Sequence, residues 1–247
     1  MIKGKIGLEI ESYTLEIDNL IQYCKTKNWS YEDDGSIREP RNRNYRTIEF
    51  KVGVYKIEDL NKMIEDLKIP FEMVKVNNSC GLHINVSFDN ITDYYKLLSW
   101  DFVNNFQEKI KREFKTQKEI KRLNNHYCKL YLSDDEFNIL TERQLKTTSK
   151  VSERYFSVNY NSFNLHKTIE FRIFASTTSI KKLKSYLKLL FESIEEHLSK
   201  TTIQDKTLNI SLKRVTQNDK KPIIKTDILQ QCEIIEILQQ KQINGGL

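Results

Sequence analysis

The most regular feature of the chain is an alternation of polar and apolar residues that recurs in four short segments. In one-letter code these segments are IGLEIE (residues 6–11), TIEF (47–50), GLHINV (81–86) and TIEFRIF (168–174). Successive side chains of a β-strand point to opposite faces, so each segment predicts a strand with one apolar and one polar face. If the four strands share a sheet, its polar face collects Glu9, Glu11, Glu49, His83, Asn85, Glu170 and Arg172.

Two interpretations of this polar face are open. In the first, it is only the side of the sheet that faces water, which requires nothing more than hydrophilic residues. In the second, it holds metal ions, because like charges placed side by side are unfavourable unless cations neutralise them. The set contains four carboxylates, one His and one Arg, in a chain with more basic than acidic residues. This composition favours the metal-bearing interpretation.

The rest of the chain predicts further strands and helices around this sheet. Apolar residues at helical spacing predict helices over about residues 15–24, 57–67, 92–123, 134–145 and 180–198. Strands are expected over residues 3–13, 29–32, 47–52, 71–76 and 155–160. Near the C-terminus, a strand over residues 208–215 and a helix over residues 226–240 follow. The pattern therefore predicts an α+β fold in which helices pack on the apolar face of the sheet.

Composition narrows the class of protein. With 38% hydrophobic and 11% aromatic residues, the chain of 247 residues is expected to form a folded globule. No apolar run approaches the roughly 20 residues of a membrane span, and the first strand begins without a signal-peptide segment. The four cysteines are far apart and form no CxxC pair, which is typical of reduced thiols. We therefore expect a cytoplasmic protein, and a net charge of +6 is too small to indicate nucleic acid by itself.

Several charged segments have two interpretations each. The turn Asp33–Ser36 is either only a hairpin or a rim that places Asp34 and Ser36 at a site. Residues 38–46, with four arginines, form either a solvated loop or a loop that closes over a phosphate. Arg154 is either a surface residue or a phosphate contact. The helix over residues 92–123 has a basic face that is either solvated or bound to an acidic partner: Lys109, Lys111, Arg112, Lys115, Lys118, Lys121 and Arg122.

Six motifs in chain order resemble those of the amidoligase family. They are GLEIE, DGSI, TIEF, CGLHINV, RYFSVN and TIEFRIF, and they extend from Gly7 to about Phe174. The family is related to glutamine synthetase and glutamate–cysteine ligase, which are carboxylate–amine ligases. The resemblance implies a curved, mainly antiparallel sheet like that of the glutamine synthetase catalytic domain, in a catalytic domain over residues 1–200. Residues 201–247 are expected to form a C-terminal extension of strand and helix packed on the same domain.

The resemblance also implies roles for the matched residues. The implied metal ligands are Glu9, Glu11, His83 and Glu170. The implied catalytic residues are Arg172, Arg154 and Glu49. The residues implied to bind the nucleotide are Arg172, Arg154, Asn159 and Asn85. Asn85 departs from the family, which often has a second His at this position, but Asn also coordinates hard cations or binds substrate.

The implied reaction joins a carboxylate to an amine with ATP and Mg²⁺ or Mn²⁺. A carboxylate is a poor electrophile, so ATP first converts it to an acyl phosphate, which the amine then attacks. Magnesium prefers oxygen ligands and neutralises phosphate charge. The chain has no Walker-type glycine loop, so metals and Arg side chains would hold the phosphates. The expected substrates are amino acids, a peptide or a protein tail, and neither nucleic acid nor a membrane is an expected partner.

Two other functions stay open at this point. A metal-dependent hydrolase or nuclease would use the same carboxylates and His83, with the basic helix as the contact for nucleic acid. A binding or structural protein would keep the fold without catalysis, but the joint presence of Glu9, Glu11, Glu170 and Arg172 with His83 argues against it. Dependence on ATP separates a ligase from a hydrolase.

Overall fold

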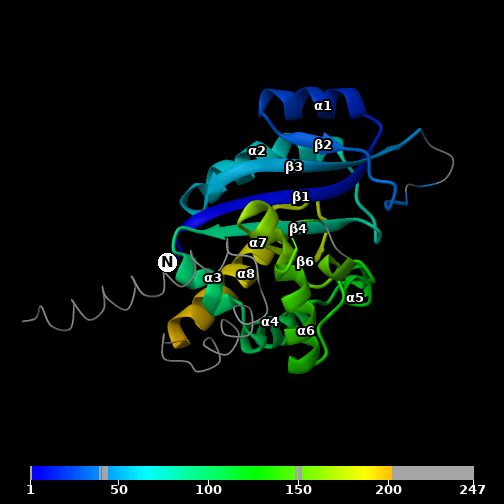
Figure 1. The fold of residues 1–247 in the computed structure, drawn as a ribbon. Helices are drawn as coiled ribbons and strands as arrows, with labels where there is room; N and C mark the ends of the chain where they lie inside the picture. The colour runs from blue at the N-terminus through cyan, green and yellow to red at the C-terminus, as the bar shows by residue number, and fades with distance from the viewer. Residues whose placement is uncertain (1, 39, 41–43, 148, 150–151, 202–247) are drawn as a thin grey trace, which may run out of the picture. The chain divides into compact units, whose positions relative to one another are not determined.

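A single antiparallel sheet organises the part of the chain that the computed structural model describes, which comprises residues 2–38, 40, 44–147, 149 and 152–201. Its six strands follow the order β2-β3-β1-β4-β6-β5 (Figure 1). The strands are β1 (Gly4–Thr14), β2 (Ser30–Glu32), β3 (Arg46–Lys56), β4 (Gly81–Phe88), β5 (Val158–Asn159) and β6 (Ile169–Ala175). The helices are α1 (Ile17–Thr26), α2 (Leu60–Met73), α3 (Ile91–Leu97), α4 (Trp100–Glu113), α5 (Gln117–Leu123), α6 (Asp134–Leu145), α7 (Asn161–His166) and α8 (Ile180–Lys200).

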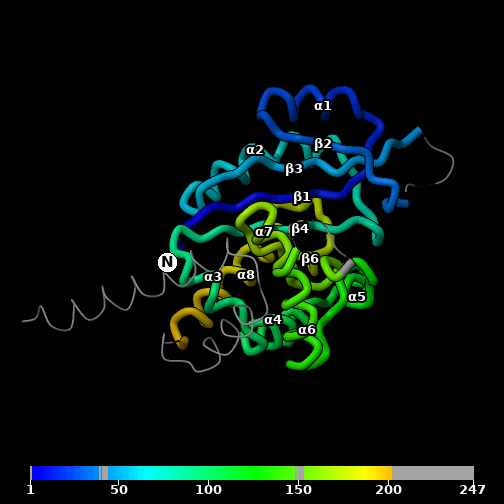
Figure 2. Tube along the Cα trace, viewed as in Figure 1, coloured from blue at the N-terminus to red at the C-terminus, as the bar shows by residue number. Residues whose placement is uncertain are grey.

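The predicted α+β class with an antiparallel sheet is confirmed, since every neighbouring pair of strands is antiparallel. The sheet is not closed, and Figure 2 shows that it is not strongly curled. A curved sheet like that of the glutamine synthetase catalytic domain stays a prediction. The strand expected over residues 208–215 and the helix over residues 226–240 lie outside the described residues. The division of the chain at residue 200 also stays a prediction.

A β-bulge in β6 keeps two sides of the sheet chemically distinct. The register between β4 and β6 shifts by one residue, so that Arg172 and Ile173 both lie opposite His83. Strict alternation would place Phe174 on the same face as Arg172. The bulge instead returns Phe174 to the apolar face, where it is fully buried with its ring centroid 6.2 Å from that of Phe106. Arg172 thereby stays on the polar face without exposing an aromatic ring.

Aromatic side chains pack helices α4 and α8 against the apolar face. The rings of Phe102 and Phe106 from α4 meet Phe171 edge-on, with centroids 6.2 and 5.4 Å apart. Tyr186 of α8 packs against Phe174 with centroids 5.0 Å apart. Buried side chains of α1 and α2 belong to the same core, including Leu20, Cys24, Met63 and Leu67. The predicted packing of helices on the apolar face is therefore confirmed.

The segment predicted to be helical over residues 92–123 is helical, but it is divided into the three helices α3, α4 and α5. Ser99 caps the start of α4 by accepting a hydrogen bond from the backbone N–H of Phe102. Thr116 and Glu119 form a capping box at the start of α5. These caps favour two new helix starts over one continuous helix. The predicted basic face is consequently divided between α4 and α5.

Helix α2 continues through Met73, so the strand predicted over residues 71–76 is wrong. Pro70 lies inside this helix and has no N–H to offer to the carbonyl of Asp66. That carbonyl accepts instead from the hydroxyl of Tyr23 in α1, at 2.7 Å. The hydrogen bond that proline removes is thus replaced by one that joins α1 to α2.

The other expected elements agree more closely with the structure. Helices α6 and α8 confirm those predicted over residues 134–145 and 180–198. Of the strand predicted over residues 155–160, only Val158 and Asn159 form β5. Within the described residues, no helix combines the length and the hydropathy that crossing a membrane requires.

Candidate active site

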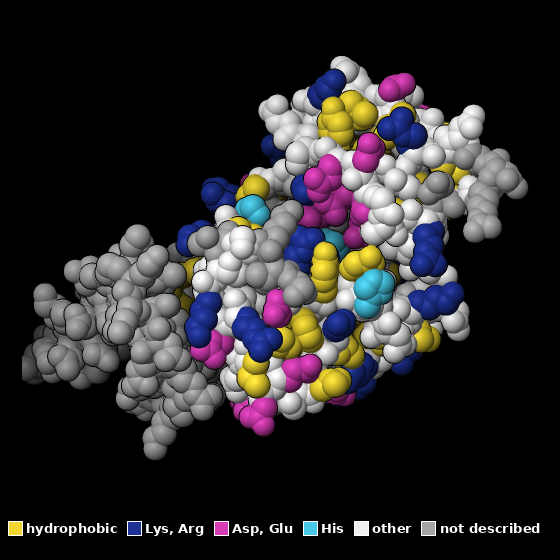
Figure 3. Space-filling model, turned by 45° about the vertical axis from the view of Figure 1, so that its right-hand side comes forward, with side chains coloured by type: hydrophobic (Ala, Val, Ile, Leu, Met, Phe, Trp, Pro, Cys, Tyr) yellow, Lys and Arg dark blue, Asp and Glu magenta, His cyan; other side chains and the backbone are white. Residues whose placement is uncertain are grey.

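A cavity of about 300 Å³ opens on the polar face of the sheet. Figure 3 shows acidic side chains gathered in a hollow of the surface, next to basic and histidine side chains. Six carboxylates line the cavity, from Glu9, Glu11, Glu32, Asp33, Asp34 and Glu49. Its basic lining residues are Lys51, Arg154 and Arg172. Acidic groups thus outnumber basic ones in a concave site, which favours the binding of cations.

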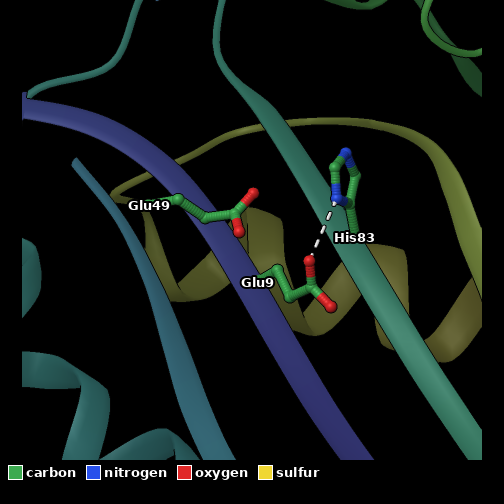
Figure 4. Close-up of side chains that lie close together, drawn as sticks. All are labelled: Glu9, Glu49 and His83. Atoms are coloured by element: carbon green, nitrogen blue, oxygen red, sulfur yellow. Dashed lines mark ion pairs between the residues drawn. The ribbon is translucent and has the colours of Figure 1, made fainter. Parts of the chain in front are cut away.

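The register of the sheet brings the predicted acidic residues and His83 together. Glu9 of β1 lies opposite His83 of β4, and Glu11 of β1 lies opposite Glu49 of β3. Ligand atoms of Glu9, Glu49 and His83 all lie within 4.8 Å of one another (Figure 4). A second group, formed by Glu11, Asp34 and Glu49, meets the same distance. Glu49 belongs to both groups, although the sequence assigned it a catalytic role.

His83 is buried and electrically neutral. Burial, together with the guanidinium groups of Arg172 and Arg122, lowers its pKa to about 3. Its Nδ1 atom has no hydrogen-bond partner among the described residues, and it lies 3.6 Å from Glu9 Oε2 and 3.4 Å from Glu170 Oε1. When Nε2 carries the ring proton, the lone pair of Nδ1 is available to a cation. This unpartnered nitrogen beside carboxylate oxygens fits a divalent cation.

Glu49 holds a proton more tightly than an ordinary carboxyl group. Burial, and then the charges of Glu9 and Glu11, raise its pKa to about 8. Lys51 opposes this effect, with Nζ 3.3 Å from Glu49 Oε1, but Lys51 also pairs with Glu32 at 2.7 Å. A carboxyl group protonated near neutral pH is characteristic of sites where several acidic groups converge.

Glu170 and Arg172 form a buried ion pair two residues apart on β6. Arg172 Nη1 donates to Glu170 Oε1, and Arg172 Nε donates to the backbone carbonyl of Tyr127 at 3.2 Å. Burial lowers the pKa of Arg172, but the charge and hydrogen bond of Glu170 more than offset it and raise the pKa. Asn159 donates to Glu170 Oε2. Both oxygens of Glu170 therefore have protein partners, and its implied role as a metal ligand stays a prediction.

Two amide side chains orient the carboxylates of the site. Asn85 Nδ2 donates to Glu9 Oε1 at 2.9 Å, as Asn159 does to Glu170. Each amide limits the rotation of a carboxylate that lines the cavity or its edge. The contacts with a nucleotide that the resemblance implies for Asn85 and Asn159 stay predictions.

The structure places Arg154 at the cavity, close to Arg172. The guanidinium carbons of Arg154 and Arg172 lie 4.8 and 5.6 Å from the ring centroid of Tyr155. Contacts of this kind between a cation and an aromatic face are attractive. Among the described residues, no acceptor lies within hydrogen-bond distance of Arg172 Nη2. The site therefore offers two neighbouring guanidinium groups to an anion.

Arg122 was predicted on the basic outer face of its helix, but it is buried inside the protein. Only 2% of the residue is exposed. Its Nε and Nη2 atoms donate to the backbone carbonyl of Arg172, at 3.2 and 2.8 Å, and Nη2 lies 3.3 Å from His83 Nε2. The guanidinium group packs against Gly81. A glycine inside a strand often marks the close approach of another group, and this was the signal in the sequence.

The turn after β2 contributes to the cavity. Asp34 and Ser36 line it, and Asp34 Oδ1 accepts from the backbone N–H of Ser36 at 2.8 Å. β2 and β3 do pair as consecutive antiparallel strands, but Asp34 and Ser36 also line the cavity, so the turn is more than a hairpin connection. In the arginine-rich loop, residues 39 and 41–43 lie outside the described residues. Lys51 also lines the cavity and was not predicted, although its position two residues after Glu49 places it on the same face of the strand.

The fold and the site define a class of protein before any comparison: an α+β protein with a cavity that offers carboxylates to cations and guanidinium groups to an anion. The sequence profile of the family described as "putative amidoligase enzyme" matches residues 5–193. Because the match covers most of the chain, the protein belongs to this family, whose name denotes the formation of amide bonds from carboxylates and amines. No curated protein matches the chain.

Proposed function

We propose that the protein is an ATP-dependent carboxylate–amine ligase that forms an amide or isopeptide bond through an acyl phosphate. The observation that carries this proposal is that one cavity holds both candidate cation sites and two guanidinium groups. The two sites share Glu49, and the guanidinium groups belong to Arg154 and Arg172. Family membership supports the reaction class. Cations and guanidinium groups together are what phosphoryl transfer from a nucleotide requires.

The chemistry requires an activated carboxylate. A carboxylate oxygen of the substrate attacks the γ-phosphorus of ATP, the bond to the bridging oxygen breaks, and ADP leaves. The amine then attacks the acyl carbon, and inorganic phosphate leaves with the electrons of the C–O bond. Charge accumulates on the phosphoryl oxygens in the first step, so groups that are already oriented toward those oxygens stabilise the transition state most.

The acidic residues would hold the cations. Glu9, Glu49 and His83 would bind one, and Glu11, Asp34 and Glu49 would bind a second. Bound Mg²⁺ or Mn²⁺ supplies neutralisation of phosphate charge. Because the pKa of Glu49 is raised to about 8, binding displaces its proton near neutral pH.

The guanidinium groups would bind the transferred phosphoryl group. Arg172 is held by Glu170 and by the carbonyl of Tyr127, so its orientation is set before a ligand arrives. Its Nη2 atom would donate to phosphoryl oxygens, and Arg154 would supply a second donor from the same cavity. Asn85 and Asn159 keep Glu9 and Glu170 oriented during the reaction.

A nuclease has less support than a ligase. The basic side chains expected to contact nucleic acid are divided between α4, α5 and the segment that joins them, and Arg122 is buried. Lys118 donates to the carbonyl of Val76, and Lys109 lies 3.8 Å from Glu196. These contacts break the continuous basic face on which that alternative depended.

A hydroxamate assay tests the proposal. The full chain is incubated with ATP, Mg²⁺, hydroxylamine and pools of amino acids or carboxylate-bearing peptides, because hydroxylamine traps acyl phosphates as hydroxamates. We expect hydroxamate and ADP in equal amounts, and neither without ATP or carboxylate. Phosphate release at the same rate with and without a carboxylate substrate would contradict the proposal, and so would cleavage of nucleic acid without ATP.

A further inference from the structure

A second hollow, of about 80 Å³, adjoins the main cavity. The two share the lining residues Glu9, Lys51, Arg154 and Arg172, so groups held in the main cavity face the smaller hollow. Its remaining wall comes mainly from β5 and α7. The proposed transfer of the phosphoryl group leaves this hollow without a ligand.

Asn161 lines this hollow and carries a buried amide oxygen that lacks a donor in the described part of the chain. The residue is 1% exposed and lines the hollow. Its Nδ2 atom donates to the backbone carbonyls of Gln144, Thr147 and Ser149, at 3.1, 3.4 and 3.1 Å, which fixes the orientation of the amide. Its Oδ1 atom is buried without a hydrogen-bond partner among the described residues. A buried carbonyl oxygen without a donor is unfavourable, so an N–H group of a ligand that paired with it would stabilise the site.

The other groups around the hollow are also suited to an amine. The negatively charged carboxylates of Glu9 and Glu170 line it. Asn85 Oδ1 has only long hydrogen bonds, of 3.4 Å, from the hydroxyls of Ser162 and Thr168. The positively charged side chains that line both hollows, those of Lys51, Arg154 and Arg172, disfavour a protonated amine. A bound amine therefore more readily takes the neutral form, which acts as a nucleophile.

We propose that the smaller hollow binds the amine substrate, and that this substrate is an unhindered primary amine. The inference rests on the proposed ligase function. The hollow is small, at about 80 Å³ against about 300 Å³ for the main cavity, which suits an NH₂ group on a short, unbranched carbon chain. The amine nitrogen attacks the acyl carbon, the C–O bond to phosphate breaks, and the departing phosphate takes the proton that nitrogen releases.

Leu165 allows a selective test, because it lines the smaller hollow and not the main cavity. Leu165→Trp should fill the hollow, whereas Leu165→Met should leave it open. In saturation-transfer NMR with the full chain, ethylamine should bind to the wild type and to Leu165→Met, with binding lost in Leu165→Trp. Any binding of acetate to the wild type should be retained in Leu165→Trp. Equal binding of ethylamine to all three proteins, or the loss of acetate binding in Leu165→Trp, would overturn the inference.

Kinetics separate this inference from the proposed function. With hydroxylamine as the amine, Leu165→Trp should raise the KM for hydroxylamine at least tenfold and change the KM for ATP less than twofold. Leu165→Met should resemble the wild type. A raised KM for ATP with unchanged KM for hydroxylamine would overturn the amine assignment. Absence of ATP-dependent hydroxamate in the wild type would overturn the ligase function, and ethylamine binding would still decide which ligand the hollow takes.

Discussion

The guanidinium group of Arg122 occupies the space that a side chain at residue 81 would need. A Cβ atom added to Gly81 would lie 2.6 Å from Arg122 Cζ, far inside van der Waals contact. From this position Arg122 donates to the carbonyl of Arg172 and lies beside His83. The N–H of Gly81 donates to the carboxylate of Glu11. One glycine thus lets a side chain of α5 reach β4 and β6 at the centre of the site.

Gly81→Ala should therefore destabilise the protein. The added methyl group must displace Arg122 from its hydrogen bonds, and overpacking of this kind costs about 1–3 kcal/mol. Urea unfolding would measure the change in free energy. Gly35→Ala is the matched control, because no atom lies within 4 Å of a Cβ at Gly35, and its effect should stay within about 0.5 kcal/mol. Equal stability of the two variants would contradict the packing described for Arg122.

Glu49→Gln should weaken the binding of Mn²⁺ at least about tenfold, because Glu49 belongs to both sets of candidate metal ligands. Mutation of residues that only support a metal ligand already changes metal affinity about 10–100-fold. Titration calorimetry or electron paramagnetic resonance would measure the affinity. Asp33→Asn is the control, because Asp33 lines the cavity but belongs to neither group. If both variants lose the same affinity, the effect is one of overall charge and Glu49 is not a ligand.

The free energy of unfolding, measured without divalent cations, should fall as the pH rises from about 6.5 to 8. The pKa of Glu49 rises from 4.5 to about 8 on folding, so the folded state binds more protons in this range. His83 has the opposite effect, because its pKa falls from 6.5 to about 3 on folding. Its contribution to the free energy of unfolding increases as the pH rises from about 3 to 6.5 and stays constant above 6.5. The expected loss is on the order of 1 kcal/mol.

Urea unfolding at several pH values tests this expectation. Glu49→Gln should flatten the profile between pH 6.5 and 8, because its amide does not titrate. Saturating Mg²⁺ should have the same effect in the wild type, because a bound cation favours the ionised carboxylate. A slope that persists unchanged in Glu49→Gln would assign the pH dependence to another group.

Arg154→Lys should lower turnover at least about tenfold while the melting temperature changes little. Lys keeps the charge but loses the planar fork that binds two phosphate oxygens, and Arg154 is only half-buried. Steady-state kinetics with varied ATP would measure the loss. Arg143→Lys is the control, because the side chain of Arg143 is 63% exposed and does not line the cavity. Full activity of Arg154→Lys would show that Arg154 does not hold phosphate.

The sequence by itself determined the polar face of the sheet and most of its acidic residues. The alternation of side chains in a strand is a local property of the backbone, so spacing alone placed Glu9, Glu49 and Glu170 each on the polar face of its own strand. The helices α6 and α8 followed from periodicity for the same reason. The breaks within the helical segment over residues 92–123 were not predicted, because the caps at Ser99 and Thr116 override the apolar repeat there.

Tertiary structure decided what no local pattern contains. Arg122 resembles any basic residue of a helix surface until α5 approaches Gly81, and it is then buried against the backbone of β6. The raised pKa of Glu49 and the unpartnered Oδ1 of Asn161 depend in the same way on which segments meet. Burial and electrostatic interaction are properties of distance in space, and residues far apart in the chain acquire them only when the strands pair.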